Sequence, residues 1–158
     1  MMEDTPKRIS EKKALSRMAT LCAKRECCVF DIKSKLHRYE LDVDSIERIV
    51  EKLKKEKYID ELRFARSFIN DKIHFNKWGK VKIIFALRQK KVPQAIISEA
   101  FLDFTDEQLN DSLEDVLSAK WKTIKGKTEQ DKRTKLIRFG LGRGFEMNHI
   151  LAYIDKLR

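Results

Sequence analysis

The stretch CCVFDIKSKLHRYELDVDSIERIVEKL, residues 27–53, decides the fold of this 158-residue chain. Ile32 and Leu36 are four residues apart, which places both side chains on one face of a helix. After a short turn, a second apolar series has the spacing i, i+3, i+4 and i+7 of an amphipathic helix. Its members are Ile46, Ile49, Val50 and Leu53. The stretch therefore predicts two consecutive helices, the second capped by Asp44 or Ser45.

The same apolar pattern recurs twice further along the chain. The first copy has Ile32, Leu36, Leu41, Ile46, Ile49, Val50 and Leu53. Adding 51 to these numbers gives Ile83, Leu87, Val92, Ile97, Ala100, Phe101 and Phe104. Adding a further 53 gives Leu136, Gly140, Phe145, Ile150, Tyr153, Ile154 and Leu157. Of these 21 positions 20 are apolar, whereas a composition of 42% hydrophobic residues predicts about nine by chance, so the chain contains an internal repeat.

A further helix with apolar residues at helical spacing precedes each copy, over residues 14–22, 62–73 and 109–117. Polar residues that favour helix starts precede the second and third of these helices, at Asp60 or Glu61 and at Thr105 or Asp106. Pro93 marks the equivalent start of a third helix in the second copy. Each unit is therefore predicted to contain three helices.

The sequence thus predicts an all-α fold of three tandem three-helix, helix-turn-helix-like repeats that form an elongated, curved stack. No segment shows the alternation of period two that is typical of a strand. The expected division is a flexible N-terminus over residues 1–11, followed by repeats over residues 12–59, 60–105 and 106–158.

The formal charge of +10 indicates a polyanionic partner, such as nucleic acid or an acidic protein surface. No apolar run approaches the ~18 residues that a membrane span requires. The N-terminus is polar and lacks the apolar core of a signal peptide, so a cytoplasmic protein is expected. Three cysteines in such a protein are expected to be reduced, with Cys22 as a small apolar core residue.

Positive charge is concentrated at matched positions of the second and third copies. Lys80 and Lys82 correspond to Arg133 and Lys135, and Lys90 corresponds to Arg143. The first copy has Val29, Asp31 and Tyr39 at these positions. Residues 60–91 and 120–138 are strongly basic, whereas residues 94–119 contain seven Asp or Glu and no Lys or Arg. If the units stack in similar orientations, the matched residues form a basic stripe that contacts a polyanion.

Several kinds of catalytic site are not supported. Gly79-Lys80 lacks the earlier glycine of a phosphate-binding loop, and GLGRG at 140–144 is better explained as a helix end with Gly144 in a left-handed conformation. The cysteines have no zinc-binding spacing, so no metal or cofactor is expected. A metal-dependent nuclease built on Asp103, Asp106 and Glu107 serves only as a contrasting hypothesis, and the chain is predicted not to be an enzyme.

Four segments resemble the RecX family, whose members regulate the RecA recombinase: LCAKRECCVFDIKSKL, YIDELRFARSFINDK, WGKVKIIFALRQKKV and LIRFGLGRGFEMNHI. The resemblance covers residues 12–157, and its clearest matches are Ile59-Asp60, the segment 63–65, Gly79 and the segment 143–145. The chain departs from the family pattern at Lys91, where Gly is expected, at Gly140, where Leu is expected, and at the Cys27-Cys28 pair.

The resemblance implies a monomeric, non-enzymatic modulator that lies in the groove of the RecA filament on single-stranded DNA. Such a protein suppresses ATP hydrolysis and strand exchange and binds DNA alone only weakly. The residues expected to contact the filament or DNA are Arg25, Lys77, Trp78, Lys80, Lys82, Arg88, Lys90, Arg133, Lys135 and Arg143. Trp78 has a second interpretation as a half-buried residue before a helix, and Gly79 is expected to permit the turn into that helix.

A stand-alone helix-turn-helix regulator that binds nucleic acid directly remains the alternative function. It predicts tight binding to a particular duplex in the absence of recombinase, whereas a filament modulator predicts weak DNA binding alone.

Overall fold

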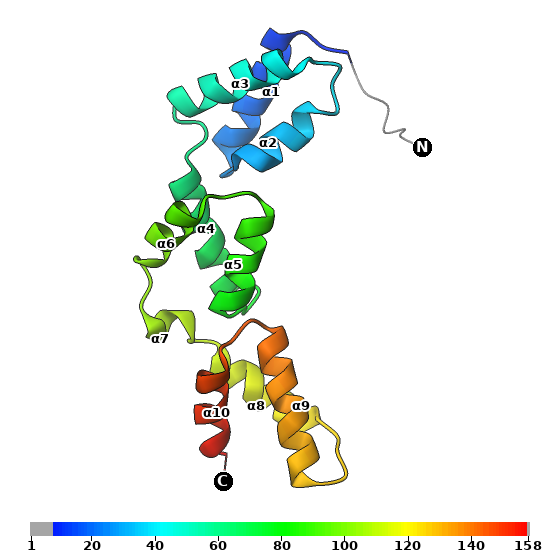
Figure 1. The fold of residues 1–158 in the computed structure, drawn as a ribbon, viewed down its shortest axis with the longest axis vertical. Coiled ribbons are helices and arrows are strands. Elements are labelled where there is room, and N and C mark those ends of the chain that lie inside the picture. The colour runs from blue at the N-terminus through cyan, green and yellow to red at the C-terminus, as the bar shows by residue number, and fades with distance from the viewer. Residues whose placement is uncertain (1–7, 158) are drawn as a thin grey trace.

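The computed structural model describes residues 8–157, which form an elongated stack of helices (Figure 1). The helices are α1 (Glu11–Lys24), α2 (Val29–Leu36), α3 (Val43–Lys55), α4 (Glu61–His74), α5 (Lys80–Gln89), α6 (Gln94–Phe101), α7 (Asp106–Leu109), α8 (Leu113–Thr123), α9 (Glu129–Gly142) and α10 (Met147–Asp155). The predicted all-α fold of stacked three-helix units is confirmed. None of these helices is long and apolar enough to cross a membrane.

Three hydrophobic cores follow one another along the stack. The first lies among α1, α2 and α3, the second among α4, α5 and α6, and the third among α8, α9 and α10. Leu36 and Leu87 occupy matched, fully buried positions in the first two cores. Their counterpart Gly140 is also buried, and a Cβ there would lie 2.8 Å from Ile150 Cδ1. The missing leucine is therefore compensated by close packing of α10 on α9.

The helix starts agree with the sequence prediction at three positions and differ at one. Pro93 is the N-cap of α6, as expected. Asp60 and Thr105 are the N-caps of α4 and α7, and each side chain accepts a hydrogen bond from a backbone N–H. Asp42, rather than the expected Asp44 or Ser45, caps α3, with 2.7 Å between its Oδ1 and the amide nitrogen of Ser45. Asp42 is extended, as a capping residue must be, whereas Asp44 and Ser45 already lie in the first turn.

The single helix expected to carry Leu109, Leu113 and Leu117 is instead broken into α7 and α8. Leu109 packs into the second core, while Leu113 and Leu117 pack into the third. One straight helix cannot place these residues in two separate cores. The break falls at Asn110–Ser112, where the Asn110 side chain donates to the Asp106 carbonyl at 2.9 Å, a local bond that competes with helix continuation.

The middle helices of the second and third units end in the same way. Gly144 has φ +96°, as predicted, and the Phe145 amide donates to the Gly140 carbonyl at 3.1 Å. Lys91, at the matched position, has φ +60° although it is not a glycine. This departure from the family pattern therefore preserves the backbone conformation, at a steric cost that glycine does not incur.

The N-terminal segment expected to be flexible lies mostly outside the described residues. Of residues 8–11, Ser10 caps α1 and Glu11 begins it, with Arg48 donating to Glu11 at 2.7 Å. This hydrogen bond lowers the pKa of Glu11 below its ordinary value.

Candidate interaction surface

The three middle helices, α2, α5 and α9, follow one another along one side of the stack (Figure 1). The end of α9 lies against the start of α5, and the Lys90 side chain at the end of α5 reaches Asp31 at the start of α2. Matched residues of the repeat therefore recur along this side. We call this side of the molecule the middle-helix face.

The joint between the second and third units is made of backbone. The Gly79 amide donates to the Arg143 carbonyl at 2.8 Å, and the Val81 amide donates to the Gly144 carbonyl at 3.0 Å. A Cβ on Gly79 would lie 2.4 Å from the Gly144 carbonyl carbon. Gly79 has φ −84°, so it is required for this contact and not for the turn that the sequence predicted.

The joint between the first and second units combines charged side chains with Cys28, which follows α1 and is buried in the second core. Lys90 Nζ lies 2.9 Å from Asp31 Oδ1, and Arg63 Nε lies 2.8 Å from Glu26 Oε1. The Val29 amide donates to Glu61 Oε1 at 2.8 Å. Burial raises the pKa of Glu61 above its ordinary value, an effect that this hydrogen bond opposes.

The six matched basic residues each have a partner within the chain. Lys80 lies over the Phe101 ring and Lys82 over the Trp78 ring, with Nζ 5.2 and 4.6 Å from the ring centroids. Arg133 Nη2 lies 3.5 Å from Asp155 Oδ1, and Lys135 Nζ donates to the Lys125 carbonyl at 2.5 Å. Lys90 bonds Asp31, and Arg143 Nη2 donates to the Asn76 carbonyl and, at 3.2 Å, to the Lys77 carbonyl.

Lys90 and Arg143 therefore have the same structural role. Each lies at the end of a middle helix and contacts the preceding unit. Tyr39, the matched residue of the first unit, instead packs against its own core. This role accounts for a basic residue at these positions without any partner molecule.

The other predicted residues are more dispersed. Arg88 donates to Gln94 Oε1 at 2.8 Å. Lys77 is exposed and has φ +55°. Trp78 is half-buried against the second core, and Lys72 lies over its ring together with Lys82. Arg25 is exposed, and it lines a hollow between the first two units.

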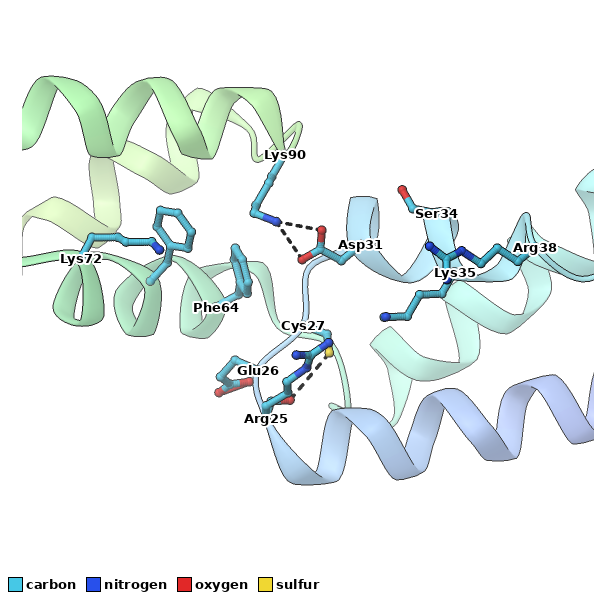
Figure 2. Close-up of a pocket in the computed structure, with 11 residues that line it drawn as sticks. Arg25, Glu26, Cys27, Asp31, Ser34, Lys35, Arg38, Phe64, Lys72 and Lys90 are labelled. Carbon is cyan, nitrogen blue, oxygen red and sulfur yellow. Dashed lines mark hydrogen bonds and ion pairs between the residues drawn. The ribbon is translucent and has the colours of Figure 1, made fainter. Parts of the chain in front are cut away.

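This hollow has a volume of about 520 Å³ and is lined by five basic side chains (Figure 2). We call it the inter-unit hollow. It combines an apolar wall with a ring of charged and polar side chains from α2, α4 and the segments that follow α1, α2 and α5. Its lining is Arg25, Glu26, Cys27, Asp31, Ser34, Lys35, Arg38, Phe64, Phe68, Lys72 and Lys90.

Sequence reasoning identified Arg25 and Lys90 but missed Lys35, Arg38 and Lys72. The available signal was the spacing of Asp31, Lys35 and Arg38, which places the first two on one face of α2 and the third just beyond its end. Lys35 and Arg38 are not among the matched basic positions, because the second copy has Ala86 and Gln89 there. The contribution of Lys72, from α4, depends on the packing of two units.

The third unit has a second basic hollow on the same side of its middle helix, with a volume of about 640 Å³. Lys135 and Arg138 of α9 line it, at the repeat positions of Asp31 and Ser34. Between the two hollows, α5 exposes Val81 and Phe85, whose side chains are not covered by the described residues. The middle-helix face is thus basic at both ends and apolar at its centre.

No three His, Cys, Asp or Glu side chains within residues 8–157 are grouped to hold a metal ion. Asp103, of the contrasting nuclease hypothesis, pairs with Arg66. Burial raises the pKa of Cys22 and of Cys28 to about 12, which disfavours the nucleophilic thiolate form of both.

Comparison with known proteins gives the family. Models described as "RecX, second three-helix domain" and "RecX, third three-helix domain" match residues 60–100 and 106–154. The regulatory protein RecX of Prosthecochloris aestuarii is 33% identical over 149 residues, which span 92% of this chain and 94% of that protein. The chain belongs to the RecX family. It is thus a member of a family of regulatory proteins and not of a known enzyme family.

Other RecX proteins show similar relationships. The RecX protein of Clostridium acetobutylicum is 34% identical over 125 residues, which cover 76% of this chain and 57% of that protein. A crystal structure of a regulatory protein RecX superposes with a TM-score of 0.84 at 23% identity, covering 92% of this chain and 73% of that one. The crystal structure of RecX from Lactobacillus salivarius superposes with a TM-score of 0.76 at 19% identity, covering 93% and 96%. These two structures support the shared RecX fold.

Proposed function

We propose that this protein regulates the RecA recombinase by lying along the RecA filament on single-stranded DNA and suppressing ATP hydrolysis and strand exchange. Membership of the RecX family supports RecA as the partner. The observation that carries the mode of action is the middle-helix face, with basic hollows at both ends and exposed apolar residues between them.

The elongated stack suits a partner that repeats along an axis (Figure 1). Three units, which we take as residues 12–59, 60–105 and 106–158, offer several weak contact sites on one chain. Contacts made by linked sites reinforce one another through their high effective concentration, so a monomer is sufficient for tight binding to a filament. The protein binds DNA alone more weakly than it binds the filament.

The decisive experiment measures ATP hydrolysis by the cognate RecA on single-stranded DNA while this protein is titrated. We expect half-inhibition at well below one molecule per RecA subunit, because one stack spans neighbouring subunits. Raising the salt from about 50 mM to about 200 mM weakens the inhibition, since contacts to phosphates are screened and counterions compete. In a parallel assay, strand exchange is expected to be inhibited at a similar concentration of this protein, and salt is expected to weaken that inhibition as well.

A matched pair of substitutions tests the middle-helix face. Phe85→Glu changes a side chain of α5 that is 62% exposed, and Leu102→Glu changes one after α6 that is 82% exposed. Both variants are expected to fold, because neither side chain is in a core. Only Phe85→Glu is expected to weaken inhibition. Equal inhibition by the two variants would remove the apolar centre of the face from the proposal.

The basic stripe predicted from sequence is tested by Lys80→Glu combined with Lys82→Glu. Its control is Lys52→Glu combined with Lys55→Glu, which reverses two exposed charges on α3. A larger loss of inhibition in the first double variant supports contact at the matched positions. Absence of any effect of the unaltered protein on active RecA, at equimolar concentration, would refute the proposed function. Tight binding to one particular duplex would then favour the stand-alone regulator.

A further inference from the structure

The inter-unit hollow contains more positive charge than the protein itself neutralises. Five cationic side chains and two carboxylates line it. Both carboxylates already have partners, because Asp31 bonds Lys90 and Glu26 bonds Arg63. Within residues 8–157, Arg25, Lys35, Arg38 and Lys72 form no ion pair with a carboxylate. Like charges that converge without counter-ions repel one another, and an anionic ligand relieves that repulsion.

The cations come from separate parts of the fold and surround one space (Figure 2). Arg25 follows α1, Lys35 and Arg38 belong to α2 and its end, and Lys72 belongs to α4 of the next unit. Such a site exists only when the first two units are packed together. The arrangement therefore differs from a basic helix face, whose charges spread over an open surface.

The size and lining of the hollow favour a particular class of ligand. A volume of about 520 Å³ exceeds what one carboxylate fills, and the cations lie on opposite walls. Two arginines supply planar guanidinium groups that bind phosphate oxygens in pairs, and two lysines supply point charges. The half-buried Phe68 gives one wall an apolar surface. A ligand with several linked phosphate groups satisfies more of these donors than a single anion.

We propose that the inter-unit hollow is a binding site for linked phosphate groups, and that occupancy loosens the joint between the first two units. Lys90 lies on the rim of the hollow, where it bonds Asp31 from the first unit. A phosphate group that enters the hollow competes with Asp31 for Lys90. Loss of that bond weakens the contact between α5 and α2, so ligand binding changes how firmly the first unit is held.

The proposal does not depend on RecA, so its test uses the full chain alone. The source of the phosphates is either the backbone of a nucleic-acid strand or a small polyphosphate. The first arm measures fluorescence anisotropy of a labelled oligothymidine of about 16 nucleotides, which matches the upper range of known single-strand site sizes. The second arm adds pyrophosphate as a competitor, and a poly-glutamate peptide as a competitor of similar charge without phosphate.

The informative variant is Lys35→Glu combined with Arg38→Glu, and the matched control is Lys52→Glu combined with Lys55→Glu. Both pairs lie in the first unit and alter the net charge equally. We expect the hollow variant to bind the oligonucleotide at least about tenfold more weakly and the control less than about threefold. The slope of log Kd against log salt is expected to fall by about 1.4 in the hollow variant, about 0.7 for each lost phosphate contact.

The expected change at the joint is faster hydrogen exchange at the α2 amides Ile32 and Lys33 when ligand is bound. Pyrophosphate that displaces the bound oligonucleotide at least as well as unlabelled oligonucleotide does, at equal phosphate concentration, would support the site. That result would assign the site to small polyphosphates. Equal weakening in the two double variants would overturn the proposal, because overall charge would then explain binding. Competition by poly-glutamate that equals or exceeds pyrophosphate would also overturn it, since the site would then not select phosphate.

Discussion

Gly79 and Gly144 meet with no space for a side chain between them. The Gly79 amide donates to the Arg143 carbonyl at 2.8 Å, and a Cβ on Gly79 would lie 2.4 Å from the Gly144 carbonyl carbon and oxygen. The second and third units are therefore in direct backbone contact, whereas the first and second are joined by ion pairs and by Cys28, which is buried in the second core. The two joints should respond differently to salt, acid and substitution.

Gly79→Ala is expected to open the joint between the second and third units. The atoms that the new methyl group meets are backbone and cannot rotate away, so overpacking costs about 1–3 kcal/mol. The measurement is hydrogen exchange at the Val81 amide, which donates to the Gly144 carbonyl and should lose protection. Gly142→Ala is the control, because a Cβ there has no neighbour within 4 Å. Protection of Val81 that survives in Gly79→Ala would contradict the backbone joint.

Lys91→Gly is expected to stabilise the protein. Lys91 has φ +60°, a conformation that costs about 1–2 kcal/mol for a residue with a Cβ. Glycine removes this strain but loses more entropy on folding, so we expect a net gain of about 0.5–1 kcal/mol. Urea denaturation measures the gain. Lys52→Gly, inside α3, should instead destabilise by about 1 kcal/mol, and a loss of stability in both variants would refute the strain at Lys91.

The bond between Lys90 and Asp31 is expected to contribute a coupling energy that salt reduces. Both side chains are 32% exposed, so a double-mutant cycle with Lys90→Met and Asp31→Asn should give about 0.2–1 kcal/mol at low salt. The same cycle for Arg8 and Glu40, which are 85% and 48% exposed, should give almost no coupling. A coupling at Lys90 and Asp31 that is unchanged between low and high salt would show that the joint is not electrostatic.

Glu61→Gln is expected to change how stability depends on pH. Burial raises the pKa of Glu61, so the folded protein holds that proton more tightly than the unfolded chain does. The contribution of Glu61 to the free energy of unfolding is therefore present at low pH. It is lost as the pH rises above 4.5, the ordinary pKa of this group, and through the pKa in the folded protein. Relative to the unaltered protein, Glu61→Gln should become more stable as the pH rises above 4.5.

Asp42→Asn supplies the opposite sign in the same measurement. Hydrogen bonds from Ser45 lower the pKa of Asp42. Its contribution to the free energy of unfolding is therefore present at neutral pH, and it is lost as the pH falls below 3.8, the ordinary pKa of this group, and through the pKa in the folded protein. Urea denaturation midpoints across the pH range should therefore diverge from the unaltered protein in opposite directions for the two variants. Parallel curves would show that neither carboxyl group has the environment described above.

The sequence by itself determined the three-helix repeat and most of its cores. A spacing of 51 residues relates Leu36 to Leu87, and both side chains are fully buried. Such positions can be predicted because local helix geometry decides which side chains share a face, and the apolar ones turn toward the core. The caps at Asp60 and Thr105 and the left-handed Gly144 are equally local. The break between α7 and α8 was not predicted, because the helical spacing of Leu109, Leu113 and Leu117 continues across it.

The tertiary structure decided what the basic residues touch. The sequence matched Lys90 with Arg143 as charges, but the stacking of units makes both of them contacts to the preceding unit. It also brings Lys72 of α4 to the same hollow as Lys35 of α2 and Arg38, which follows α2. Such groupings depend on residues more than 30 positions apart and on how whole units pack, and local periodicity contains no information about either.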